Sequence, residues 1–184
     1  QKLFKTIISQ TSFATSTSET RPVLTGLNFK IEKNTLECTA TDSYRLAVKK
    51  IILDNNAVEN SNIIIPTKNL NELVKLMNED EETIEMHIFA NKVVFKFGQI
   101  NMMTRLISGT YPDTSKLIPE TYELTMKVKY DDLYSAIDRA SLLTNESDKN
   151  TIKFETTNDT AIISSNIPEI GNVEEKITVE KNND

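Results

Sequence analysis

The chain has 184 residues, of which 38% are hydrophobic and 26% are charged, a composition typical of a soluble globular protein. No apolar run is long enough to cross a bilayer, and no basic start followed by an apolar stretch marks a signal peptide. The net charge of -6 argues against tight nonspecific binding to phosphates. The single cysteine, Cys38, excludes an internal disulfide and a thiolate metal site, and favours a reducing cytoplasm.

Helical spacing marks the start of the chain. Side chains that recur at helical intervals are Leu3, Phe4, Ile7, Ile8 and Thr11. This spacing predicts an amphipathic helix over residues 2–14, with Lys2 and Lys5 off the apolar stripe. A polar run over residues 15–20 predicts a loop. Strands are then expected over residues 24–32, 35–41 and 44–53, and Lys33-Asn34 suits a tight hairpin turn between the first two.

The middle of the chain continues this pattern. Three consecutive isoleucines within residues 62–66 predict a buried strand, and Thr67 is suited to cap the helix that follows. That helix carries Leu70, Leu73, Val74 and Met77 on one face, and the acidic run 79–82 is expected to end it. Further strands are expected over residues 83–89, 92–97 and 100–106.

The order of elements then begins again. A strand over residues 122–129 is followed by a predicted helix over 131–143. The apolar side of this helix is expected to hold Leu133, Tyr134, Ile137, Ala140 and Ser141. Strands follow over residues 151–155, 160–165 and 173–180. Repetition of one supersecondary unit predicts a duplicated α+β architecture, with helices on one face of antiparallel sheets.

Two short runs carry the strongest signals of function. In Cys38-Thr-Ala-Thr-Asp-Ser-Tyr-Arg-Leu-Ala47 a strand is expected to stop at Asp42-Ser43 and to restart at Tyr44. In Gly109-Thr-Tyr-Pro-Asp-Thr-Ser-Lys-Leu-Ile-Pro119 a turn opens at Pro112-Asp113 and closes at Pro119. Each run places an apolar residue beside a basic one, which suits a groove for a short peptide with apolar anchors and an acidic group.

These runs, in this order, closely resemble the bacterial DNA sliding clamp, the beta subunit of the replicative DNA polymerase, of the low-GC Gram-positive type. The stretch Thr20-Arg-Pro-Val-Leu-Thr-Gly26 and the predicted third helix strengthen the resemblance, which covers nearly the whole chain. It implies a DNA clamp fold. Residues 1–119 would form the complete central, second domain, and residues 120–184 the truncated N-terminal half of the third domain.

The resemblance also implies a function without bond chemistry. The intact protein would be a homodimeric ring that encircles duplex DNA, independently of sequence, as a processivity factor. It would tether the replicative polymerase, the clamp loader and repair proteins through short peptide motifs. No cofactor and no metal are expected, and polymerase or nucleotidyltransferase labels would apply only by association. The net negative charge is compatible with this function, because a ring that encircles DNA need not grip it.

Positions that match the family's peptide pocket are Leu24, Thr41, Ser43, Tyr44, Arg45, Leu46, Pro112, Lys116 and Leu117. Positions implied to face DNA are Lys2, Lys5, Lys68, Lys75 and Arg139. Two departures from the commoner pattern affect the pocket: Ser43-Tyr44 stands where many relatives have Gly-His or Ser-His, and Lys116 stands where Arg is common. Because part of the family's pocket lies outside this chain, we expect weak but measurable peptide binding.

Other interpretations of these residues stay open. Leu24 and Leu46 could be ordinary core residues, and the helix lysines could only confer solubility. A standalone peptide-binding adaptor without DNA contact is the main alternative function. A hydrolase built on Asp42 and Asp113 is a third, although each aspartate also suits a turn. His87 has no nucleophile pattern near it, and the acidic run 79–82 lacks the regular spacing of an ion site.

Overall fold

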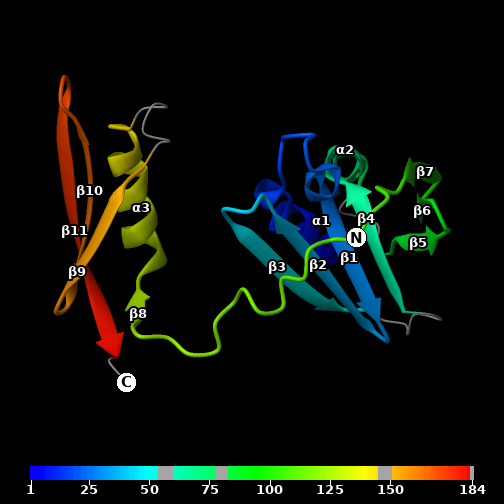
Figure 1. The fold of residues 1–184 in the computed structure, drawn as a ribbon, viewed down its shortest axis with the longest axis horizontal. Helices are drawn as coiled ribbons and strands as arrows, with labels where there is room; N and C mark the ends of the chain where they lie inside the picture. Colours follow the sequence, from blue (N-terminus) through cyan, green and yellow to red (C-terminus); the bar gives the residue numbers. More distant parts are fainter. Residues whose placement is uncertain (54–59, 78–82, 145–150, 183–184) are drawn as a thin grey trace. The chain divides into compact units, whose positions relative to one another are not determined.

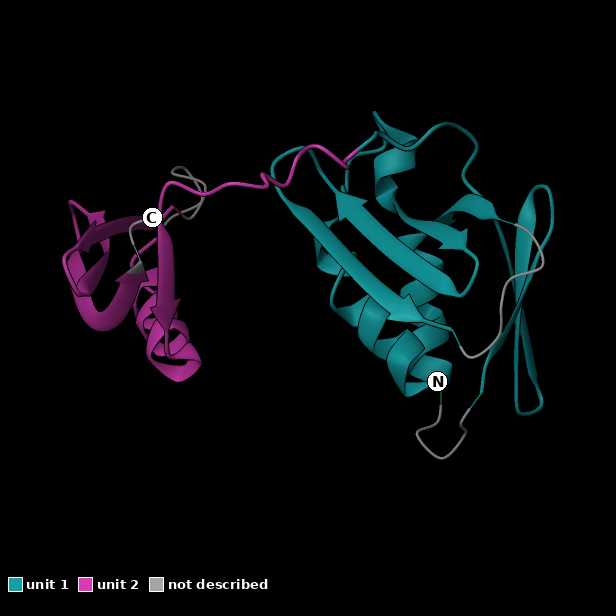
Figure 2. Cartoon of the chain, turned by 90° about the horizontal axis from the view of Figure 1, so that it is seen from below, with its two compact units in different colours: residues 1–113 teal, residues 114–184 magenta. Residues whose placement is uncertain are grey.

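The structure is a computed structural model that describes residues 1–53, 60–77, 83–144 and 151–182. Two compact units divide the chain, residues 1–113 and residues 114–184 (Figure 2). The sequence placed the domain boundary after Pro119, a few residues further along. No helix in these described ranges is long and apolar enough to span a membrane.

In its described residues, the first unit contains two helices, two short 3-10 turns and two antiparallel sheets (Figure 1). Its helices are α1 (Lys2–Ser9) and α2 (Thr67–Leu76), and its 3-10 turns are η1 (Ser12–Ala14) and η2 (Pro22–Thr25). One sheet has the order β3-β2-β1-β4, formed by β1 (Gly26–Glu32), β2 (Thr35–Thr41), β3 (Leu46–Ile52) and β4 (Ser61–Pro66). The other has the order β5-β6-β7, formed by β5 (Glu85–Ile88), β6 (Lys92–Phe97) and β7 (Ile100–Arg105).

Over the residues described between 114 and 182, the second unit has one helix and one four-stranded sheet. Its elements are β8 (Thr125–Val128), α3 (Tyr130–Ser141), β9 (Lys153–Thr157), β10 (Thr160–Ile167) and β11 (Gly171–Asn182), and the strand order is β8-β11-β10-β9. In the part of the chain that the structure describes, α1, α2 and α3 are each followed by three consecutive antiparallel strands. This repetition confirms the duplicated α+β architecture that the sequence predicts.

The core of the first unit joins both sheets to both helices. Phe29 of β1 and Phe95 of β6 are fully buried, and the ring of Phe4 from α1 lies 5.9 Å and 5.7 Å from them, centroid to centroid. Helix α1 packs on α2 and β3, while α2 packs on β4 and β1. Cys38 is buried in the same core, and burial raises the pKa of its thiol to about 12.

The first helix ends earlier than its apolar periodicity predicts. The Thr11 hydroxyl donates to the carbonyl oxygen of Ile7 at 2.6 Å, and the chain tightens into the 3-10 turn η1 after Ser9. The prediction for Leu24 was also wrong in its local structure, since Pro22 opens the 3-10 turn η2 and β1 begins only at Gly26. A proline at the first turn position favours this, because its φ is fixed there.

The predicted cap of α2 was wrong as well. The N-cap position is Pro66, without a side-chain hydrogen bond, and Thr67 is the first helical residue. The Thr67 hydroxyl is buried and has no hydrogen-bond partner in the described part of the chain. The apolar face itself is confirmed, with Leu70 and Leu73 fully buried. The acidic run 79–82 lies outside the described residues.

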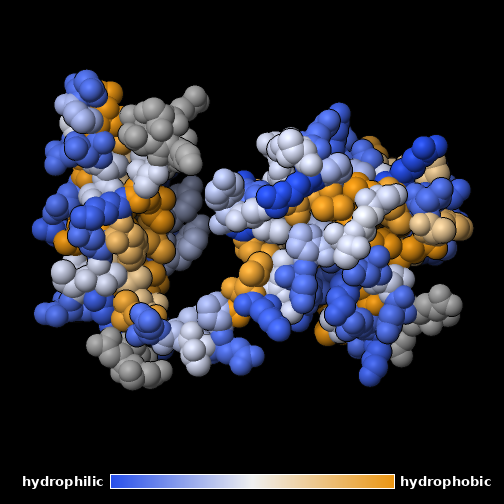
Figure 3. Space-filling view, viewed as in Figure 1, coloured by the Kyte–Doolittle hydropathy of each residue, from blue (hydrophilic) through white to orange (hydrophobic). Residues whose placement is uncertain are grey.

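Helix α3 buries part of the predicted face, namely Ala140 and Leu133, but not Tyr134 or Ile137. Ala136 and Ala140 are fully buried against β10 and β11, with Leu133 partly buried beside them. Tyr134 and Ile137 are exposed at 59% and 38%, so apolar side chains reach the surface along this helix (Figure 3). Helical spacing alone cannot distinguish two overlapping stripes when alanines form one of them, because alanine contributes little to the pattern.

Candidate peptide-binding site

The loop between β2 and β3 is organised by its own side chains. The Asp42 carboxylate accepts the backbone N–H groups of Tyr44 at 2.9 Å and Arg45 at 3.0 Å. The Thr41 hydroxyl donates to the Arg45 carbonyl oxygen at 2.8 Å and accepts the Ser43 N–H at 3.1 Å. Because these backbone N–H groups are bound within the loop, β3 begins at Leu46, whereas the sequence predicted a start at Tyr44. The turn interpretation of Asp42 is confirmed.

Charge is fixed at the same loop. The Tyr44 amide bound to Asp42 holds the pKa of that carboxyl below its usual range, and the Arg45 amide and guanidinium act in the same direction. Arg45 Nε lies 3.0 Å from Asp42 Oδ2, and its Cζ lies 5.6 Å from the centroid of the Phe13 ring. Arg21 donates to the Ser43 hydroxyl at 3.2 Å. Two guanidinium groups therefore lie at this loop.

The apolar part of the site is a small cluster separate from the main core. Leu24 packs with Ile64 and Tyr111, with Val23 and Ile107 at the edge of the cluster. Leu24 is only 3% exposed and therefore lies beneath the surface of the candidate site, whereas Leu46 is half-buried. Leu24 is thus a core residue of this cluster, and its predicted place in a pocket floor is compatible with that.

The remaining predicted pocket residues differ in exposure and in location. Tyr44 is 93% exposed, and Pro112, which follows Tyr111 in the first unit, is exposed too. Lys116 and Leu117 belong to the second unit and are exposed, and the Leu117 N–H donates to the Thr114 carbonyl oxygen at 3.1 Å. The pocket role of Lys116 and Leu117 stays a prediction.

The sequence did not single out Phe13, Arg21 or Tyr111 as residues of this site. Arg21 and Tyr111 lie inside the two stretches that carry the resemblance, so their positions offered a signal. Phe13 offered none, because its contact with Arg45 joins residues far apart in the chain. Such contacts arise from packing and not from local pattern.

The predicted DNA-facing residues lie on the three helices. Lys2 and Lys68 are exposed and Lys5 is half-buried, on α1 and α2, which pack against each other. Lys75 pairs with Glu72 at 2.8 Å along α2. Arg139 pairs with Glu175 of β11 through two hydrogen bonds of 2.8 Å and 2.9 Å, and this pairing raises the pKa of Arg139 and lowers that of Glu175. The Arg139 guanidinium is therefore directed toward β11.

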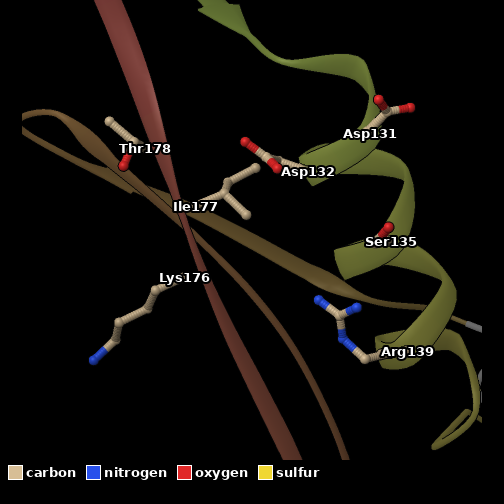
Figure 4. Close-up of a pocket in the computed structure, with 7 residues that line it drawn as sticks. All are labelled: Asp131, Asp132, Ser135, Arg139, Lys176, Ile177 and Thr178. Atoms are coloured by element: carbon tan, nitrogen blue, oxygen red, sulfur yellow. The ribbon is translucent and has the colours of Figure 1, made fainter.

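A hollow of about 480 Å³ lies between α3 and β11 (Figure 4). Its lining residues are Asp131, Asp132, Ser135, Arg139, Lys176, Ile177 and Thr178. Two acidic and two basic side chains balance one another there, and the lining pairs no nucleophile with a histidine base. The hollow offers no chemistry that the sequence predicts.

Other candidates for chemistry have simpler local partners. The His87 ring nitrogen Nε2 lies 2.9 Å from Glu85 Oε2, two exposed side chains on β5. Over the described ranges of the chain, no group of three or more His, Cys, Asp or Glu side chains is arranged to hold a metal ion.

The repeated helix-and-sheet units define the class of the protein, a DNA clamp fold. Residues 1–113 match the family model "DNA polymerase III beta subunit, central domain", and residues 115–184 match the model of the C-terminal domain. The chain belongs to the DNA polymerase III beta subunit family, the bacterial sliding clamps, and the resemblance seen in the sequence is confirmed.

Curated relatives and solved structures agree with this assignment. The beta sliding clamps of Staphylococcus epidermidis and Staphylococcus aureus are 52% and 51% identical over 176 residues, 96% of this chain and 46% of theirs. The sliding clamp structure from Bacillus subtilis has a TM-score of 0.92 at 43% identity, covering 98% of this chain and 49% of that one. A Pseudomonas aeruginosa clamp bound to griselimycin has a TM-score of 0.88 at 26% identity, covering 98% and 48%. The chain spans about half the length of these relatives.

Proposed function

We propose that this chain is part of a sliding clamp, a processivity factor of DNA replication that acts in the cytoplasm. The observation that carries the proposal is the succession of a central and a C-terminal clamp domain match along one chain. The first unit would belong to the central domain and the second unit to the third domain. In the intact protein, two such subunits would form a head-to-tail ring with three domains each.

The proposed mechanism is topological and requires no bond chemistry. A ring that encircles duplex DNA and also binds a polymerase keeps the polymerase near its template, because the tether raises its effective concentration there. Dissociation then no longer competes with extension. The subunit would be non-catalytic and would need no cofactor.

DNA contact would come from the lysines of α1 and α2. Long ammonium side chains attract phosphates without reading bases, since backbone contacts carry no sequence information. A few such contacts, screened by salt, leave a ring free to slide. We base this part of the proposal on the exposed Lys2 and Lys68, because Lys75 and Arg139 already pair with carboxylates of the same unit.

Replacing Lys2 and Lys68 by alanine is expected to weaken binding of duplex DNA at low salt. Removal of one lysine–phosphate pair reduces the slope of log K against log salt by about 0.9, so the slope is expected to fall by roughly 2. The measurement is a fluorescence anisotropy titration of a labelled duplex at several salt concentrations. The matched control removes the same charge from Lys33 of the hairpin turn and Lys96 of β6. Equal losses in both double variants would contradict a helix surface for DNA, and retained peptide binding without any DNA binding would favour the adaptor.

Peptide partners would bind at the loop between β2 and β3. Leu46 and Pro112 offer apolar surface, while Arg45 and Arg21 supply cationic groups suited to an acidic side chain or a carbonyl oxygen. The griselimycin complex of a related clamp supports a binding surface on this fold. We propose griselimycin and short peptides of polymerase, clamp loader and repair proteins as ligands of this site.

The Leu46→Asp variant is expected to lose binding of a short peptide with leucine and phenylalanine anchors and one aspartate. A carboxylate at this half-buried position would repel the aspartate and would remove apolar surface from the site. The measurement is a fluorescence polarisation titration with the labelled peptide, with unlabelled griselimycin as competitor. The control is Ile52→Asp, at an exposed position further along β3. Equal affinities of wild type and Leu46→Asp would overturn the assignment of the site.

A further inference from the structure

A segment without strand structure crosses from β7 to the loop between β2 and β3. We call residues 106–111 the strap. The Ile107 N–H donates to the carbonyl oxygen of Ile64 in β4 at 2.9 Å, which fixes the start of the strap. At its other end the Tyr111 hydroxyl accepts the backbone N–H of Thr41 at 2.9 Å. The strap therefore joins β4 to the last residue of β2.

The packing around Tyr111 fixes the position of its hydroxyl. The residue is only 7% exposed, and its ring packs with Leu24 and Ile64 in the small cluster that is separate from the main core. Burial raises the pKa of its phenol, so the hydroxyl stays protonated at neutral pH. Since the ring packs outside the main core, removal of the hydroxyl alone is expected to leave that core intact.

Thr41 is the residue from which the loop is organised. Its hydroxyl bonds to both the Arg45 carbonyl oxygen and the Ser43 N–H, and its own N–H is taken by Tyr111. Thr41 is buried, so removal of the Tyr111 hydroxyl would leave its N–H without a protein partner. Thr41 would then be free to move, and with it the loop residues that it holds.

We propose that Tyr111 is a positioning residue of the peptide site, whose hydroxyl holds Thr41 and thereby sets the conformation of the loop that carries Arg45. This inference rests on the proposed peptide-binding function. It assigns to the site a residue, Tyr111, that contacts the loop and not the ligand. A looser loop would bind only from the fraction of molecules in the correct conformation, which lowers the apparent affinity by that fraction.

The test is the Tyr111→Phe variant, which removes one oxygen atom and keeps the ring. We expect the peptide described above to bind about tenfold more weakly, since one buried amide loses its partner. The change is expected in the association rate, with a nearly unchanged dissociation rate, because the bound loop has the same ligand interactions in both proteins. Amide hydrogen exchange of Thr41 is expected to accelerate, while exchange in β1 stays the same. The control is Tyr122→Phe, at an exposed tyrosine of the second unit.

A second variant keeps the test decisive. Thr41→Val removes the hydroxyl through which Thr41 holds Ser43 and Arg45, so the loop no longer depends on the position of Thr41. The double variant Thr41→Val, Tyr111→Phe is therefore expected to bind no more weakly than Thr41→Val alone. Unchanged affinity, association rate and Thr41 exchange in Tyr111→Phe would overturn the inference but leave the proposed function intact. Additive losses in the double variant would overturn it too. A wild-type chain that does not bind the peptide would instead remove the proposed function.

Discussion

Replacing Phe95 by alanine is expected to lower the free energy of unfolding of the first unit by about 3–5 kcal/mol, the range for deleting a buried phenylalanine ring. Phe95 is completely buried, with a relative exposure of 0%, and its ring meets that of Phe4 at 5.7 Å with an interplanar angle of 54°. Phe4 in turn meets Phe29 at 5.9 Å. The deletion therefore removes the ring packing through which the sheet of β5, β6 and β7 is joined to α1.

Cys38 provides the measurement for this prediction. It is the one cysteine of the chain, it is buried in the core that contains Phe95, and its thiol has a pKa raised to about 12. The thiolate is the reactive form, so labelling by a thiol reagent requires the first unit to unfold. In a urea series, the midpoint of Cys38 labelling is expected to fall sharply in Phe95→Ala.

The control for this experiment is Phe89→Ala. Phe89 follows β5 and is 49% exposed, and the Lys92 ammonium lies 5.3 Å from the centroid of its ring. A surface substitution of this kind is expected to change stability by less than about 1 kcal/mol. Equal shifts of the labelling midpoint in the two variants would mean that Phe95 does not join the sheets.

Sequence patterns correctly predicted the helices and strands that are determined by local periodicity. The alternation in residues 92–97 corresponds to β6, and the Lys33-Asn34 turn joins β1 to β2 with Glu32 opposite Thr35. The expected repetition of a helix and three strands is present three times. In these elements burial and backbone hydrogen bonding follow from residues near one another in the chain, so the pattern carries the information.

Local patterns failed where side chains compete with backbone pairing. The Asp42 carboxylate accepts hydrogen bonds from the backbone N–H groups of Tyr44 and Arg45, so β3 begins two residues later than predicted. At the end of α1, the Thr11 hydroxyl donates to the Ile7 carbonyl oxygen. The sequence contains both residues, but it does not show which amide or carbonyl group each will bind. Side-chain hydrogen bonds of this kind shift an element's boundary by two or more residues while leaving its existence intact.

The same limit applies to the candidate site, because the sequence indicates the residues of the loop but not the residues that hold it. The resemblance located the loop of Thr41 to Leu46, and the structure describes its internal hydrogen bonds. The interactions that hold the loop from outside come from Phe13, Arg21 and Tyr111, which approach it only after folding. Tyr111 is 70 residues from Thr41 in sequence, beyond the reach of any local rule.

Gly26→Ala is expected to lower the free energy of unfolding of the first unit by about 3 kcal/mol and to weaken peptide binding as well. Gly26 opens β1 and pairs with Pro66 of β4. A Cβ atom there would lie 2.6 Å from Ile64 Cγ2, 2.8 Å from the Ile65 carbonyl oxygen and 2.8 Å from Ile107 Cδ1. A backbone oxygen cannot rotate away as a side chain can, so β1 and β4 must separate.

The separation would reach the candidate site directly. Gly26 follows η2, which carries Leu24, and Ile64 and Ile107 belong to the cluster that Leu24 and Tyr111 share. The matched control is Asn62→Ala, at an exposed position of β4 opposite Lys30, where alanine adds no atoms. Urea unfolding followed by Cys38 labelling, together with the peptide titration, is expected to show both effects in Gly26→Ala and neither in Asn62→Ala. Reduced stability in Gly26→Ala with full peptide affinity would show that the small cluster does not support the binding loop.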